Sequence, residues 1–247
     1  MNKLMEKKVV KWTYDYSALP TSASFDAADI NETADTITIA NHPFETGDLV
    51  GLVLTPTSGV TSTAPALSTA YYVIKIDKDT VSLATSAANA YAGTLTALTA
   101  GSAADCLLVK NAFGAIDTGI TLPAGAIVTG GYIDVKTNFQ SLDTIGGNVD
   151  AATIAFSSGI GAADLFAATA ISSGTTWDAN ATYQVLAGTP VLGSDASTLT
   201  AGTAVILQAA VGASLLEVGT AAVHPTMTIA VDPLTAGKLD LYIEYIS

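Results

Sequence analysis

Residues 116–138 of the 247-residue chain read IDTGITLPAGAIVTGGYIDVKTN. The stretch predicts a strand, a turn and a longer strand, because Pro123–Ala124–Gly125 cannot continue a ladder and β-branched and aromatic residues follow it. Gly130–Gly131 interrupts the second strand and indicates a β-bulge or the close approach of another backbone. We expect the two strands to form a hairpin on which the rest of the second half of the chain packs.

Other segments have the period of two that half-buried strands require. In residues 8–17 it places Trp12, Tyr14 and Tyr16 on one face and Lys11, Thr13 and Asp15 on the other. The further predicted strands are 36–40, 48–54, 71–77, 80–84, 105–110, 149–157, 182–187, 203–211, 226–232 and 238–246. Many short strands with Gly/Thr turns predict an all-β fold, a jelly-roll-like β-sandwich.

Local turn signals refine this pattern. Lys78–Asp79 should join the strands on either side of it as a hairpin. Residues 86–91 fit a single helical turn ending at Gly93. Residues 161–172 are rich in alanine and fit either a short helix or a strand.

The charge balance excludes one class of partner. The chain has 9 lysines, no arginine and 22 acidic residues, for a net charge of −13, and only 13% of its residues are charged. Nucleic-acid surfaces need clustered basic residues, and arginine above all supplies bidentate phosphate recognition. We therefore expect no nucleic-acid partner.

The cysteine content and the hydropathy of the chain indicate in which cellular compartment it folds. A single cysteine, Cys106, excludes an internal disulfide and a cysteine-based zinc site, and its strand-like surroundings favour a buried apolar role. The N-terminal residues are basic but lack the apolar core of a secretory signal. No run approaches the roughly 18 apolar residues of a membrane span. The sequence therefore predicts folding in a reducing cytoplasm without a membrane partner.

The basic residues are concentrated at the N-terminus. Lys3, Lys7, Lys8 and Lys11 stand against one acid within residues 1–11, while the remainder of the chain is strongly acidic. One interpretation is a solvated terminus. The other is an arm that docks on an acidic neighbouring subunit, and the four lysines are our candidate interface residues.

A run of acids at residues 26–35 suggests two alternatives. Asp26, Asp29, Glu32 and Asp35 are typical of a calcium loop in type but lack the alternating spacing and central glycine of an EF-hand. We favour a solvated acidic connector between structural units.

Catalytic motifs are not found in the sequence. His42 and His224 each precede a proline and have no acid at metal-ligand spacing, so a structural role at a turn is favoured. There is no G-x-S-x-G, H-E-x-x-H or Walker loop. We therefore predict no catalytic, metal-binding or cofactor-binding residue, no cofactor and no enzymatic activity.

Two further groups are candidates for a carbohydrate-active site. Asp143, Asp150, Asp164 and Asp178 lie near predicted loops, but nothing in the sequence singles out a pair for glycoside hydrolysis. Trp12 and Trp177 suit either sugar stacking or packing, and packing is the commoner use.

The first half of the chain resembles a known module. NHPFETGDLV at 41–50 and AYYVIKIDKDTVSLATSAANAYAGT at 70–94 are similar to a small β module found in bacteriophage structural proteins and large bacterial surface proteins. The residues that carry the resemblance are Asn41, His42, Phe44, Thr46, Gly47, Asp48, Tyr71, Tyr72, Val73, Leu83, Ala84, Ala90 and Gly93. The resemblance implies a spacer or display unit.

The second half resembles a family of small phage virion proteins that sit on the capsid. The similarity lies in DTGITLPAGAIVTGGYIDVKTNF, in VDAATIAFSSGIGAADLFAATAIS and in the C-terminal LTAGKLDLYIEYIS. The residues that carry it are Asp117, Gly119, Leu122, Pro123, Ala126, Ile127, Val128, Ala152, Thr153, Ile154, Leu234, Thr235, Ala236, Gly237, Lys238, Leu239, Tyr242 and Tyr245.

In that family a strand like KKVVKWTYDYS runs almost directly into the IDTGITLP segment, whereas about ninety residues intervene here. The resemblance therefore implies that residues 1–19 belong with a C-terminal sandwich, 111–247, and that 20–110 form an inserted small β module. It also implies a virion protein on the capsid surface, decorating the capsid as a head-decoration or head-fibre protein.

We expect the major capsid protein or other virion proteins as partners, and a homotrimer matched to threefold capsid positions. The alternatives are a phage tail-associated protein, or a bacterial cell-surface module for adhesion or carbohydrate binding. A surface module should carry an export signal or sorting tail, and a carbohydrate-binding module should carry an exposed aromatic platform.

Overall fold

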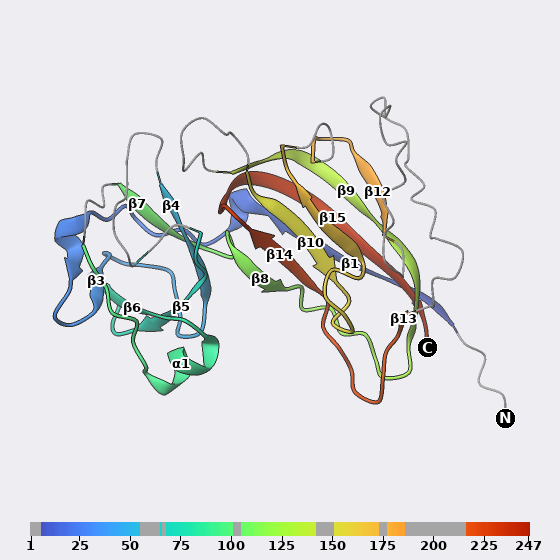
Figure 1. Cartoon of the computed structure of the whole chain (residues 1–247), viewed down its shortest axis with the longest axis horizontal. Helices are drawn as coiled ribbons and strands as arrows, with labels where there is room; N and C mark the ends of the chain where they lie inside the picture. The colour runs from blue at the N-terminus through green and yellow to red at the C-terminus, as the bar shows by residue number, and fades with distance from the viewer. Residues whose placement is uncertain are drawn as a thin grey trace.

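The computed structural model describes residues 6–54, 65, 68–100, 105–141, 151–172, 177–185 and 216–247. Within these ranges the chain is almost entirely β and its sheets are antiparallel, so the predicted all-β fold is confirmed. Figure 1 shows two lobes side by side, with β1 and β8–β15 in one and β2–β7 and α1 in the other. We call them the sandwich lobe and the small lobe.

The element bounds follow the chain. The sandwich lobe holds β1 (Lys7–Asp15), β8 (Gly114–Asp117), β9 (Ile127–Ser141), β10 (Thr153–Ser157), β11 (Phe166–Ala170), β12 (Thr182–Val185), β13 (Leu216–Glu217), β14 (Thr226–Ala230) and β15 (Leu234–Ile246). The small lobe holds β2 (Ile30–Asn31), β3 (Thr36–Thr38), β4 (Leu49–Leu54), β5 (Tyr71–Lys75), β6 (Thr80–Ala84), α1 (Ala87–Ala92) and β7 (Cys106–Lys110). Short 3₁₀ turns, Tyr16–Ala18 and Ala27–Asp29, follow β1 and precede β2.

The sandwich lobe consists of two sheets that share one core. One sheet has the order β1-β15-β9-β12, with β13 also paired to β9, and the other has the order β11-β10-β14-β8. Their inward side chains form a single buried cluster, in which Ile133 and Leu241 of the first sheet join Phe156 and Ile229 of the second. The chain changes sheet between β8 and β9, β9 and β10, β11 and β12, β13 and β14, and β14 and β15.

The stretch 116–138 contributes to both sheets, so the predicted hairpin is wrong. The predicted turn is present: the Ala126 N–H donates to the Pro123 carbonyl at 3.1 Å, and Gly125 has a φ of +73°. However, β8 pairs with β14 and β9 pairs with β15. Because β8 and β9 lie in opposite sheets, their apolar sides face each other across the core. In a hairpin the two strands would lie side by side in one sheet, with their apolar sides facing the same way.

Strand β1 belongs to the sandwich although the small lobe follows it in sequence. All nine of its residues pair with β15, from Lys7 opposite Ile246 to Asp15 opposite Lys238. The resemblance implied that this strand belongs with the C-terminal sandwich but did not identify its partner strand. The predicted inward face is also confirmed, since Tyr14 is buried and stacks on Phe139 with ring centroids 6.0 Å apart.

Gly130–Gly131 forms both features that the sequence indicated. The register between β9 and β15 shifts at this point, with Glu244 opposite Gly130 and Tyr245 opposite Val128, which is a bulge. A Cβ at Gly131 would lie 2.1 Å from the carbonyl oxygen of Tyr242. The two longest strands of the sandwich therefore approach each other as closely as only glycine permits.

The small lobe has its own sheet, in the order β2-β3-β6-β5-β4-β7, and its own core. The predicted hairpin of β5 and β6 is present. The predicted helical turn is α1, which is capped by the Ser86 side chain and ends at Gly93 in the left-handed region. Residues 161–172, for which the sequence fits either a helix or a strand, contain strand β11. The predicted strand 203–211 lies outside the described residues.

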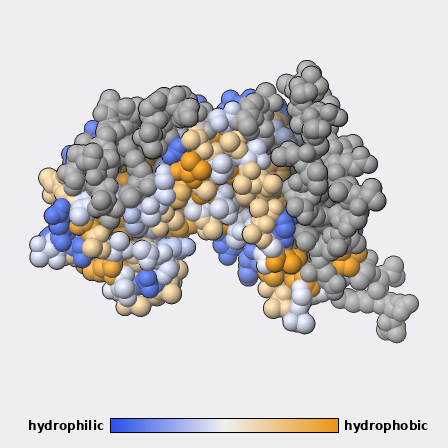
Figure 2. All heavy atoms as spheres, in the orientation of Figure 1, coloured by the Kyte–Doolittle hydropathy of each residue, from blue (hydrophilic) through white to orange (hydrophobic). Residues whose placement is uncertain are grey.

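Direct contacts join the two lobes. The Leu234 N–H donates to the Ala112 carbonyl at 2.9 Å, and the Ser68 hydroxyl donates to Asp232 Oδ1 at 3.3 Å. Leu49 of the small lobe is part of the buried cluster of the sandwich. Figure 2 shows a notch in the outline between the lobes. The division into units 1–19, 20–110 and 111–247 stays a prediction.

Replacing Gly131 with alanine should destabilise the protein strongly. The new methyl group would overlap the Tyr242 carbonyl oxygen, so β9 and β15 would have to separate. We expect a loss of about 1–3 kcal/mol or more in the free energy of unfolding, measured by urea denaturation. Gly219→Ala is the matched control, because a Cβ there meets no atom within 4 Å. Equal stability of the two variants would contradict the close approach.

Candidate interaction face

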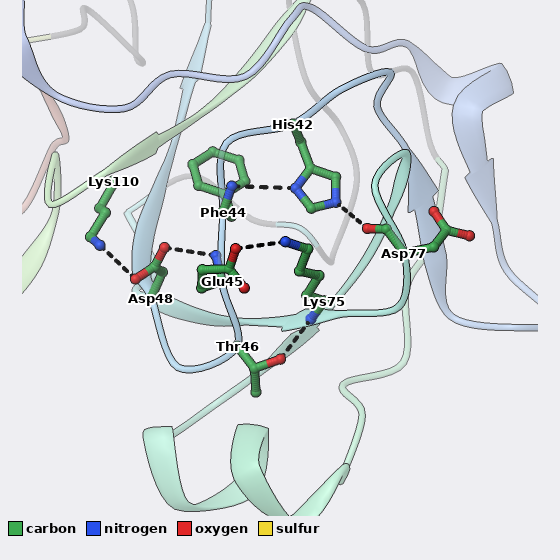
Figure 3. A network of polar contacts seen from close by, with 8 residues as sticks. All are labelled: His42, Phe44, Glu45, Thr46, Asp48, Lys75, Asp77 and Lys110. Atoms are coloured by element: carbon green, nitrogen blue, oxygen red, sulfur yellow. Dashed lines mark hydrogen bonds and ion pairs between the residues drawn. The ribbon is translucent and has the colours of Figure 1, made fainter.

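The motif that carries the first resemblance builds a turn (Figure 3). His42 is buried; its Nε2–H donates to the Asp77 carbonyl at 2.9 Å and its Nδ1 accepts from the Phe44 N–H at 3.3 Å. A carbonyl can only accept, so the hydrogen bond to Asp77 fixes the proton on Nε2. Phe44 itself is in the core of the small lobe. The predicted structural role of His42 is confirmed.

Two ion pairs extend this turn to neighbouring strands. Glu45 Oε1 lies 2.6 Å from Lys75 Nζ on β5, and Asp48 Oδ1 lies 2.6 Å from Lys110 Nζ on β7. The Thr46 hydroxyl oxygen also accepts a hydrogen bond from the Lys75 N–H at 3.1 Å. These contacts hold the turn on the sheet, so the motif is architectural.

The acidic segment 26–35 is more than a solvated connector. Its four carboxylates accept hydrogen bonds from backbone N–H groups, three of them on a segment about 65–80 residues further along the chain. The donor–acceptor pairs are Asp105–Asp26, Asp26–Asp29, Ala100–Glu32 and Leu98–Asp35, at 2.6–2.9 Å. The acids therefore fasten the segment before β7 to the small lobe. Among the described residues, no group of three or more His, Cys, Asp or Glu side chains is placed to hold a metal ion.

The remaining catalytic candidates are also held by structural contacts. His224 Nδ1 donates to the Ile120 carbonyl at 3.1 Å. Asp164 accepts from the Ser158 and Gly161 N–H groups and so closes the loop between β10 and β11. Cys106 is buried in the core of the small lobe, as predicted. Asp143 and Asp150 lie outside the described residues.

The two tryptophans pack as the sequence favoured. Trp177 is buried and meets Phe139 and Phe166 edge to face, at centroid distances of 5.6 and 5.5 Å. Trp12 is half-buried and packs on the sandwich core. Sugar stacking on Trp177 is thereby excluded, because its ring has no exposed face.

The most distinctive surface is the side of the β1-β15-β9 sheet that faces away from the core. We call it the outer face. Because side chains alternate along a strand, it is formed by every second residue of the three strands. Its members include Lys7, Val9, Lys11, Thr13, Asp15, Tyr132, Asp134, Lys136, Lys238, Asp240, Tyr242 and Glu244.

A pair of stacked tyrosines occupies the centre of the outer face. Tyr132 and Tyr242 are opposite one another on β9 and β15, with ring centroids 4.3 Å apart and planes inclined by 17°. The Nζ atom of Lys11 lies 5.5 Å from the Tyr242 centroid, on the β1 side. Tyr132 and Lys11 thus flank the Tyr242 ring, so Tyr242 does not provide the exposed aromatic platform that sugar stacking requires.

Ion pairs surround the tyrosines and include two of the predicted interface lysines. Lys7 Nζ lies 2.7 Å from Glu244, Lys11 Nζ lies 2.9 Å from Asp240, and Lys238 Nζ lies 2.7 Å from Asp15. Lys136 pairs with Asp134. Of the other candidates, Lys8 donates from Nζ to the Ser247 hydroxyl at 3.2 Å, and Lys3 lies outside the described residues. An intermolecular role for the four lysines stays a prediction.

Asp240 is the most buried charge of the outer face, with only 9% of its side chain exposed. Burial alone would raise its pKa, but hydrogen bonds from the Thr13 hydroxyl at 2.6 Å and from Lys11 hold the pKa below its ordinary value. The hydrogen bond to Asp240 in turn raises the pKa of Lys11. Hydrogen bonds from Lys238 and Ser17 likewise lower the pKa of Asp15.

Asp240→Asn should remove stability at neutral pH and weaken the acid dependence of folding. A carboxyl whose pKa is lowered by folding adds stability above its unfolded pKa of about 4, and loses it as pH falls through the folded pKa. We expect a loss of about 1–3 kcal/mol at pH 7, typical of a hydrogen-bonded charge, that shrinks toward pH 2. Urea unfolding across this pH range provides the measurement.

The control for that experiment is Glu45→Gln, which removes an exposed ion pair. The Glu45 side chain is 72% exposed, so the pair should contribute about 0–1 kcal/mol. If Asp240→Asn followed the wild-type pH profile in parallel, with a constant offset, the account of its carboxylate would be wrong.

Comparisons with known proteins link the chain to no family: no family model, no curated protein and no solved structure matches it. The two resemblances therefore rest on the residues quoted for them. No helix in the described part of the chain is long and apolar enough to cross a membrane.

Proposed function

We propose that the chain is a non-enzymatic structural protein of a bacteriophage virion that decorates the capsid exterior, as a head-decoration or head-fibre protein. The observation that carries the proposal is the position of β1, which pairs along its whole length with β15 although the small lobe follows β1 in sequence. An N-terminal strand that completes the C-terminal sheet is the arrangement that the virion-protein resemblance implies.

The polar contacts support the non-enzymatic part of the proposal. Both histidines are engaged in hydrogen bonds to backbone groups at turns, and Asp164 and the acids of 26–35 accept hydrogen bonds from backbone N–H groups. Groups committed in this way stabilise loops and are poorly placed to move protons during a reaction.

The shape of the molecule supports an orientation on the particle. Glu6 and Ser247 exchange backbone hydrogen bonds of 3.4 Å at the end of the sandwich lobe that lies away from the small lobe (Figure 1). Lys7 and Lys8 lie at the same end. We propose that this end contacts the major capsid protein in a homotrimer, that the small lobe projects outward, and that the protein is made in the host cytoplasm.

A second candidate function is adhesion, as a tail-associated or cell-surface module. The observation that favours it is Tyr91 of α1, a residue that is 73% exposed on the small lobe. Its ring lies against Gly47, where a Cβ would be 2.3 Å from the tyrosine hydroxyl oxygen. An exposed aromatic ring on the projecting lobe suits contact with a receptor or glycan.

Purified phage particles test the proposed function. Quantitative mass spectrometry should find the chain at a fixed ratio to the major capsid protein, and antibody labelling should place it on the head. Labelling confined to the tail would favour the adhesion candidate. Absence from particles, with recovery in the host envelope, would contradict the proposal.

The lysine-rich end can be tested separately. Replacing Lys3, Lys7, Lys8 and Lys11 together by glutamine should weaken binding to undecorated capsids and reduce its salt dependence, because salt screens contacts between exposed charges. The control replaces three small-lobe lysines, Lys75, Lys78 and Lys110, by glutamine. Binding that equals wild type at every ionic strength would show that the N-terminal lysines are only solvated.

A further inference from the structure

We infer that the outer face of the β1-β15-β9 sheet is the surface through which copies of this chain associate with one another. The inference rests on the proposed function only in the expected number of copies. Association through this face is a property of the chain in solution and does not require a capsid.

The charge distribution singles out this face for contact between identical chains. The outer face carries four lysines and four acidic residues, whereas the whole chain has 9 lysines and 22 acids. All of the net charge of −13 therefore lies elsewhere on the molecule. Like-charged copies repel one another, and contact through a neutral face brings no net like charge together.

The charges on the outer face are already paired within one chain. Each of the four lysines has its acid on the same or the neighbouring strand, as described above. In the described part of the chain, both partners of each of these ion pairs are residues of the outer face. A second copy therefore needs to supply no new counter-charge. A contact of this kind is held by its uncharged centre, because burying charges costs free energy.

That uncharged centre has the composition of a protein interface. The stacked Tyr132 and Tyr242 provide aromatic area, a residue type enriched in protein interfaces. Tyr132 is 37% exposed, and Val9, which lies on β1 opposite Glu244, is 54% exposed. Burial of these side chains by a second copy would remove exposed apolar surface from water.

The face also suits the proposed trimer. Three copies with their outer faces toward a common axis would bring three tyrosine pairs together. Their lysine-rich ends would then point the same way, with the small lobes at the opposite end. Closed rotational symmetry of this type satisfies every copy equally.

A charge inserted into the outer face tests the inference. Val9→Glu adds an acid to the outer face, opposite Glu244, while Ile76→Glu places the same charge on the small lobe at a residue that is also 54% exposed. In sedimentation velocity with the full chain, we expect wild type and Ile76→Glu to associate and Val9→Glu to require at least a tenfold higher concentration. Added salt should strengthen wild-type association, because it screens the repulsion between acidic bodies.

Thiol labelling is a second measurement, and it requires only the milder substitution of one residue by cysteine. The single native cysteine, Cys106, is buried, so Val9→Cys and Ile76→Cys each introduce one accessible thiol. Maleimide should label position 9 slowly at high protein concentration and faster on dilution, while position 76 should react at one rate throughout.

A monomeric wild-type chain at all concentrations, or equal behaviour of positions 9 and 76 in both experiments, would overturn the inference. A monomer that still decorates particles would refute this inference and leave the proposed function standing. Association through this face in a protein that binds no particle would support this inference and refute the proposed function.

Discussion

The antiparallel pairing of β15 with β1 on one side and β9 on the other is the interaction on which the rest of the structure depends. β15 contributes Leu239, Leu241 and Ile243 to the sandwich core. It is also the only described strand that pairs with β1. Without this pairing Tyr14 would lose its place on Phe139, and the first and last described residues would no longer meet.

The alternation of β15 couples the core to the outer face. Asp240 lies between two fully buried leucines, so its outward position is fixed by their inward packing. Thr13 and Lys11 then reach its carboxylate from β1, and Tyr242 stacks on Tyr132 of the neighbouring strand β9. The paired charges and the tyrosine stack are therefore consequences of strand register. A shift of one residue in that register would turn them into the core.

Features that depend on a short repeat in the sequence, such as strands, could be predicted. Contacts between residues far apart in the sequence could not. Alternation in 8–17 predicted that strand and the residues on each of its two faces. The local signals in 116–138 predicted two strands and a bulge, but they say nothing about which sheet each strand joins. The intrachain partners of Lys7 and Lys11 could not be predicted, because Glu244 and Asp240 lie more than 200 residues away in sequence. The roles of the acids in 26–35 were missed for the same reason.

Native-state hydrogen exchange tests most directly whether β1 is an integral strand of the sandwich. In β15 alternate amides point to β1 and to β9, because backbone bonds alternate along an antiparallel strand. The amides of Leu241 and Ile243 face β1, and those of Asp240 and Tyr242 face β9. We predict that both sets exchange only through global unfolding, with the same dependence on denaturant. Rapid, denaturant-independent exchange of the first set alone would show that β1 detaches from a sandwich that is stable without it.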